Sequence, residues 1–201
     1  MSVFLAISRG IDYFNIRLGR ALAWLIVVAV TVSTVNAIIR KLLNQSSNAW
    51  LELQWYLFGA VFLFCAAWTL IANEHIRIDI VNNLFSKRRR NWIDLIGHTF
   101  ALVPFCIVMI WTSVPFFLTS YRLGEMSFSA GGLPQWPAKL LIPVAFMVLL
   151  VQAISEIIKR VAIMRNAIPD PYDAPPVHAA EAEAARLLQI VKSESSKLER
   201  K

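Results

Sequence analysis

Four side chains with acid, base and imidazole chemistry stand close together near the middle of the chain: Glu74, His75, Arg77 and Asp79. On a helix, His75 and Asp79 lie four residues apart and can pair. The cluster is either an ion-paired end of a membrane-spanning helix, at the lipid headgroups, or a proton relay. We favour the ion-paired end, because one such cluster at an interface does not make a path across a membrane.

The sequence carries no signature of a known catalytic site. It has no glycine-rich phosphate loop, no Gly-x-Ser-x-Gly turn and no zinc-site spacing. We therefore expect a protein that is not an enzyme. His75 and His98 leave one redox alternative open, because two histidines on neighbouring helices can ligate a haem. That alternative is a haem-binding four-helix membrane anchor of a redox complex.

Apolar residues dominate the chain and occur in long runs. Of its 201 residues, 57% are hydrophobic and 16% are charged, whereas soluble domains are usually nearer half apolar and a quarter charged. A helix needs about 20 mostly apolar residues to cross the hydrocarbon core of a bilayer. The sequence therefore predicts an all-α membrane protein. Its four transmembrane helices are expected at about residues 21–40, 51–73, 95–118 and 137–158.

The two ends of the chain differ from the transmembrane domain, which we place at residues 21–165. Residues 1–20 repeat apolar side chains at helical spacing, which predicts either a short amphipathic helix in the interface or a solvated lead-in to the first span. Residues 166–201 form a cytoplasmic proline-rich linker and a charged tail, for which an unstructured segment is the default. The net charge of +7 comes from basic residues that flank apolar runs, so it does not indicate nucleic-acid binding.

The distribution of Lys and Arg predicts the orientation of the chain. Eleven lie in the N-terminal segment, in the loop after the second span or just after the fourth span, and four lie at the other membrane face. Positive residues concentrate on the cytoplasmic side of a membrane protein. Both termini and the central loop are therefore expected in the cytoplasm.

One face of the second span carries a distinctive set of residues. Glu52, Trp55 and Gly59 recur there at helical spacing, followed by small and apolar side chains. Small residues on one stripe let helices approach closely in lipid. Glu52 either contacts a partner subunit or serves as an acid in the first helical turn, where the positive end of the helix dipole favours it.

Together these features resemble the small membrane subunit of the tripartite ATP-independent periplasmic (TRAP) transporters. The residues that carry the resemblance are the run Asn48–Gly59, the Glu74–Asp79 cluster at the end of the same span, and the basic cluster that leads to Trp92 and Asp94. The resemblance covers roughly residues 15–165. Within the family, it is nearest to the branch for mannitol, chloroaromatic or organic-acid uptake.

The resemblance implies a function that the residues alone do not reveal. In this family a periplasmic binding protein captures a solute, often an organic acid, and delivers it to a membrane complex. The large membrane subunit holds the substrate and sodium sites and moves as an elevator. The small subunit packs on the fixed scaffold of the large one, and its own chain needs no cofactor.

The resemblance also implies a multi-pass protein of the bacterial inner membrane that takes part in secondary active symport. Its partners would be the large subunit, the binding protein and the lipid bilayer. Glu52, Trp55, Gly59, Glu74, His75, Arg77 and Asp79 are then candidates for structural or partner-interface roles. A stand-alone small exporter is a weaker alternative, because no span carries a charge at mid-depth.

Overall fold

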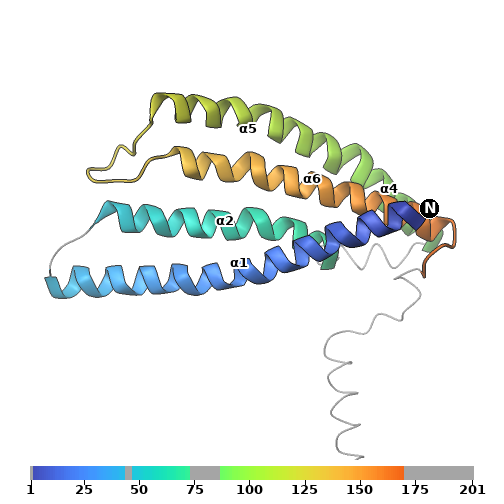
Figure 1. Cartoon of the computed structure of the whole chain (residues 1–201), viewed down its shortest axis with the longest axis horizontal. Helices are drawn as coiled ribbons and strands as arrows, with labels where there is room; N and C mark the ends of the chain where they lie inside the picture. The colour runs from blue at the N-terminus through green and yellow to red at the C-terminus, as the bar shows by residue number, and fades with distance from the viewer. Residues whose placement is uncertain (1, 44–46, 73–86, 170–201) are drawn as a thin grey trace, which may run out of the picture.

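The protein is a bundle of long helices that lie side by side (Figure 1). The computed structural model describes residues 2–43, 47–72 and 87–169. The helices are α1 (Ser2–Leu43), α2 (Asn48–Ala72), α4 (Lys87–Ile96), the π-helical η1 (Gly97–Leu102), α5 (Val103–Leu123) and α6 (Trp136–Met164). Within those ranges the β-structure is limited to a single bridge between Met126 and Pro134. The predicted all-α class is confirmed.

Four helical stretches in the described part of the chain are long and apolar enough to cross a membrane. They are Val3–Leu43, Asn48–Ala72, Arg88–Leu123 and Trp136–Met164. Each contains one of the four predicted spans almost entirely. The four-span prediction is therefore confirmed.

The distribution of side chains between inside and outside is the reverse of that in a soluble protein. Large apolar side chains point outward on every long helix, among them Trp24 on α1, Phe62 on α2 and Trp111 on α5. Many of the buried side chains are instead polar or small, such as Gln152 and Ala153 on α6. A soluble domain rarely exposes large contiguous apolar surface. This exterior fits the hydrocarbon of a bilayer, whose interior is as apolar as these side chains.

The first helix is much longer than a membrane crossing requires. α1 has 42 residues, which at about 1.5 Å per residue gives roughly 63 Å, about twice the 30 Å hydrocarbon core. The amphipathic stretch predicted at residues 1–20 is not a separate helix, because from Ser2 onward it forms the N-terminal half of α1. Figure 1 shows this half crossing the end of α6, while the remainder runs beside α2.

A widened helical turn precedes Pro104 in the third span. The Val103 backbone N–H donates to the His98 carbonyl, five residues back, as in a π-helix. A proline in a helix removes a backbone donor and crowds the carbonyl four residues before it. The wider turn of η1 lies where that crowding would occur, so the helix continues through Pro104. The crowding at this proline is thus accommodated by a π-turn.

The apolar core lies between α2, α5 and α6. Its buried residues are Ala67, Leu70, Cys106, Leu149 and Ala153. Alanine at two of these positions keeps α2 and α6 close together, as small residues do between membrane helices. This contact makes α6 the central helix of the bundle, since it packs on α1, α2 and α5.

Candidate functional site

Glu52 holds a loop at the end of the bundle opposite the N-terminus. Its carboxylate accepts a hydrogen bond from the Ser127 hydroxyl and one from the Leu133 backbone N–H, the latter at 2.6 Å. One turn further along α2, the Tyr56 hydroxyl donates to the Pro134 carbonyl over 3.0 Å. The first turns of α2 thus fasten the segment between α5 and α6.

The same loop contains two glycines that its shape requires. Gly131 has a φ of 71°, in the left-handed region that favours glycine. A Cβ at Gly132 would lie 2.5 Å from the Ser127 Cβ and 2.8 Å from a Glu52 carboxylate oxygen. No side chain fits at Gly132 unless the Glu52 contact opens.

An ion pair braces this loop against α6. The Lys139 ammonium donates to the Glu125 carboxylate and also lies 4.3 Å from the centre of the Phe116 ring. The hydrogen bond from Lys139 lowers the pKa of the Glu125 carboxyl below its usual range. Glu125 therefore carries a negative charge at neutral pH, and it pairs with Lys139 near the start of α6.

Trp55 and Gly59 lie on a face of α2 that this chain does not cover. Trp55 is 73% exposed and Phe62, one helical repeat further on, is 81% exposed. A Cβ placed on Gly59 would meet nothing within 4 Å. The face therefore offers bulky side chains beside an open glycine position, and it stays a candidate partner surface as the sequence suggested.

This face leads into an apolar groove of about 410 Å³ between α2, α5 and α6. Its walls include Phe62 and Ala66 from α2, Phe105 from α5, and Phe146 and Leu149 from α6. The Phe105 and Phe146 rings meet edge to face, with centroids 5.6 Å apart. A groove of this kind fits apolar side chains or an acyl chain.

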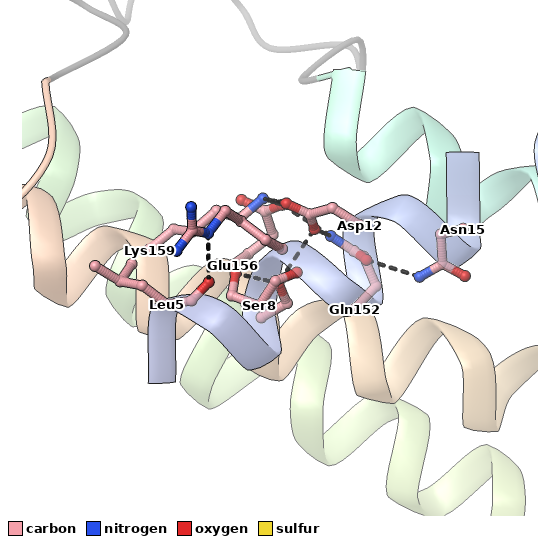
Figure 2. Close-up of polar contacts among 9 residues, drawn as sticks. Leu5, Ser8, Asp12, Asn15, Gln152, Glu156 and Lys159 are labelled. Carbon is pink, nitrogen blue, oxygen red and sulfur yellow. Dashed lines mark hydrogen bonds and ion pairs between the residues drawn. The ribbon is translucent and has the colours of Figure 1, made fainter. Parts of the chain in front are cut away.

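At the other end of the bundle, polar side chains of α1 and α6 interlock (Figure 2). The Asn15 amide donates to the Gln152 carbonyl oxygen at 2.7 Å, and the Gln152 amide donates to Asp12 at 2.8 Å. The Ser8 and Ser155 hydroxyl oxygens are 2.7 Å apart. We call the residues of this network the α1–α6 polar seam: Ser8, Asp12, Asn15, Gln152, Ser155, Glu156 and Lys159.

The one lysine of the seam pairs with both of its acids. Lys159 lies 3.0 Å from Asp12 and also pairs with Glu156 on its own helix. Gln152 and Ser155 have no exposed surface at all. Buried polar groups destabilise a fold unless they are hydrogen-bonded, so the seam fixes how α1 crosses α6.

Sequence reasoning did not find the seam. A signal was present, since Ser8, Asp12 and Asn15 recur at steps of four and three on one helix. Gln152, Glu156 and Lys159 repeat the same steps on the other. Two matched polar stripes indicate a pair of facing helices.

A buried ion pair ties α4 to α6 near the seam. The Arg160 guanidinium lies 3.2 Å from the Asp94 carboxylate and donates to the Asn91 side-chain oxygen at 3.1 Å. His98 is buried close by, in η1. Among the described residues, no group of three or more His, Cys, Asp and Glu side chains is placed to hold a metal ion.

The central cluster lies outside the residues that the structure describes. This applies to Glu74, His75, Arg77 and Asp79 alike. Their assignment as an ion-paired end of the second span, and the pairing of His75 with His98 in the haem alternative, stay predictions.

Comparison with known protein families gives a match that covers more than half of the chain. Residues 18–162 match the family described as "Tripartite ATP-independent periplasmic transporters, DctQ component". No curated protein matches the sequence. The family match agrees with the resemblance seen in the sequence and does not favour the haem-binding redox anchor.

Proposed function

The chain belongs to the DctQ component family of the TRAP transporters, and on that premise we propose that it anchors the large membrane subunit in the bilayer while that subunit moves the solute. Members of the family are small subunits of the inner membrane, and the four apolar helices fit that place. The transported solute is an organic acid or a related compound, delivered by a periplasmic binding protein. The sodium gradient drives uptake through the large subunit, and this chain contributes neither a cofactor nor a catalytic step.

The observation that carries the proposal is the uncovered face of α2 with its groove. Trp55 and Phe62 are far more exposed than the packed face of the same helix, where Ala67 and Leu70 are buried. Aromatic side chains beside an open glycine position suit close helix packing, because the glycine admits the backbone of a partner helix. We assign this face to a transmembrane helix of the large subunit.

The placement of charge supports an accessory role over an ion-conducting one. Glu52 and Lys139 lie near one end of the bundle, and the α1–α6 polar seam lies near the other. The sequence between these ends carries no ionisable side chain in the middle of a span. Ion pathways through membrane proteins use such side chains inside the spans.

The orientation and the central cluster complete the proposal. The basic residues favour cytoplasmic termini, which places the loop held by Glu52 on the periplasmic side. We assign Glu74, His75, Arg77 and Asp79 to the cytoplasmic end of the second span, where ion pairs fix its position for assembly with the large subunit.

Disulfide or bifunctional cross-linking of the complex tests the proposal. Cysteine is placed at Phe62 in a chain whose Cys65 and Cys106 are replaced by Ala, and the chain is expressed with its large subunit. Cross-links to that subunit are expected from position 62 and not from Trp24→Cys, which is equally lipid-accessible on α1. A chain that purifies without any multi-span partner, or cross-links equally from both positions, contradicts the assignment.

Uptake by proteoliposomes tests the transport part separately. Uptake is expected only when this chain, the large subunit, the binding protein and a sodium gradient are all present. Uptake that persists without sodium removes the proposed coupling but leaves the anchoring role intact.

A further inference from the structure

A basic pocket lies where α4 begins and α6 ends, apart from the α2 face and from the seam. It has a volume of about 320 Å³ and is lined by Arg88, Asn91 and Trp92 from α4, and by Ile163, Met164 and Asn166 at the end of α6. Its lining is therefore mixed, because each wall contributes both polar and apolar side chains.

The charge of the pocket is positive. Arg88 is exposed at its rim, and Arg165, which lies between two of the lining residues, is exposed as well. No carboxylate is among its described lining residues. The nearby acids are already engaged, since Asp94 pairs with Arg160 and Glu156 with Lys159. The rim therefore favours an anion.

The depth of the pocket matches the headgroup layer of the bilayer. α6 has 29 residues, or roughly 43 Å, close to the 40–45 Å thickness of a bilayer with its headgroups. With Trp136 at one surface, Met164 lies at the other. Trp92 is 47% exposed beside the pocket, and tryptophan prefers this boundary because its ring is apolar and its N–H is polar.

We propose that this pocket binds the headgroup of an anionic phospholipid, with Arg88 and Arg165 attracting the phosphate and Trp92, Ile163 and Met164 packing on the glycerol and the upper acyl chains. These three apolar side chains favour a lipid over a free phosphate ion, because a free phosphate ion has no apolar part to pack on them. The proposal depends on the membrane location of the chain and not on its transport partner.

Hydrogen bonds hold the two walls of the pocket in position. Asn91 is 4% exposed and its side-chain oxygen accepts from Arg160, so the α4 wall is tied to α6. The C-terminus of α6 is closed by backbone hydrogen bonds from Asn166 to Ile163 and from Ala167 to Ala162. Both walls are thus in place before a lipid arrives.

Lipid binding to the delipidated full-length chain in detergent tests the proposal, followed by native mass spectrometry and by thermal unfolding. Phosphatidylglycerol is expected to bind and to raise the unfolding temperature, whereas phosphatidylethanolamine and inorganic phosphate are expected to do neither. One basic side chain near an anionic surface contributes about 1 kcal/mol, so Arg88→Gln is expected to weaken binding about fivefold. Arg88→Lys keeps the charge and is expected to keep most of the affinity.

Arg122→Gln is the matched control, since it removes one exposed charge at the opposite end of the bundle. An equal loss with this variant overturns the site, because the attraction then comes from overall charge. An equal response to phosphatidylethanolamine also overturns the proposal. A response to inorganic phosphate equal to that of the lipid assigns the pocket to free phosphate and overturns the lipid assignment.

Discussion

Asn15 and Gln152 form a hydrogen bond of 2.7 Å between side chains that are 137 residues apart in the sequence. The bond joins the first membrane helix to the last. The Gln152 amide nitrogen also donates to Asp12 and Glu156, so a single side-chain amide connects three partners. The crossing of α1 over α6 therefore depends on polar contacts, in a bundle whose exterior is apolar.

Gln152→Leu is expected to destabilise the isolated chain by about 2 kcal/mol. A hydrogen bond between membrane helices contributes about 0.6 kcal/mol on average, and the buried Asn15 amide left without its partner adds about 1–3 kcal/mol. Unfolding in mixed micelles measures the change. The control is Gln54→Leu, a half-buried glutamine of α2 outside the seam. Equal losses in the two variants would show that the seam has no special role.

Arg160→Leu is expected to cost more, about 3–5 kcal/mol, because it removes the guanidinium that pairs with the Asp94 carboxylate and hydrogen-bonds to Asn91 in a buried site. Adding Asp94→Asn in the same chain is expected to restore part of that loss, since the buried carboxylate that paired with Arg160 is then neutral. The same unfolding assay checks both. Arg165→Leu, an exposed neighbour, should stay within about 0.5 kcal/mol of the parent. No recovery in the double variant would mean that the pair is not coupled.

Glu52→Ala is expected to loosen the loop between α5 and α6 while it leaves the bundle folded. The Leu133 N–H and the Ser127 hydroxyl lose their acceptor. Hydrogen exchange at Leu133 should speed up by about tenfold, which corresponds to roughly 1.4 kcal/mol of local stability. Amides in α1 should exchange as before. Unchanged exchange at Leu133 would contradict the role assigned to Glu52.

The Glu125–Lys139 pair predicts a pH dependence of the same loop. The pKa of Glu125 is lowered by the Lys139 hydrogen bond, so the pair stabilises the folded loop above the unfolded pKa of about 4.3. That stabilisation is lost as the pH falls through the lower folded value. Loop protection in the parent should therefore decline below about pH 4.3, whereas Glu125→Gln should be less protected at neutral pH and should show a smaller decline, because the Glu52 carboxylate still holds the loop. An equal decline of loop protection in the parent and in Glu125→Gln would show that Glu125 is not responsible for it.

Gly59→Ala is expected to have opposite effects on the stability of the isolated chain and on assembly of the complex. Because a Cβ there meets nothing, the substitution is expected to stabilise the isolated helix by about 0.5–1 kcal/mol. Recovery of the large subunit in pull-down should fall, because the added methyl group blocks a close helix contact. Gly10→Ala, also open on α1, should leave recovery unchanged. Undiminished recovery with Gly59→Ala would remove this face from the interface.

Local patterns in the sequence predicted the helices well and their long-range polar contacts poorly. Ala29 and Asn36 lie seven residues apart, which puts them on one face of the first span, and both residues are buried. Hydropathy also fixed the number of spans. Glu52 was singled out, but its contacts depend on how the segment around Ser127 folds back, which no local pattern specifies.

The π-turn and the extent of α1 illustrate a second limit. Pro104 lies inside the third span, and a proline alone does not show whether a helix breaks, bends or widens at that point. Residues 1–20 have the composition of a surface helix, and their continuation into α1 follows from the polar contacts with α6.

The seam also sets an order of events during synthesis. Ser8 and Ser155 are separated by 147 residues, which at about 5–20 residues per second takes a ribosome roughly 7–30 s. Throughout that interval the polar stripe of the nascent N-terminus has no partner helix. The last span is thus the segment that completes the fold, since Asp12 and Asn15 gain their hydrogen-bond partner Gln152 only when α6 has been made.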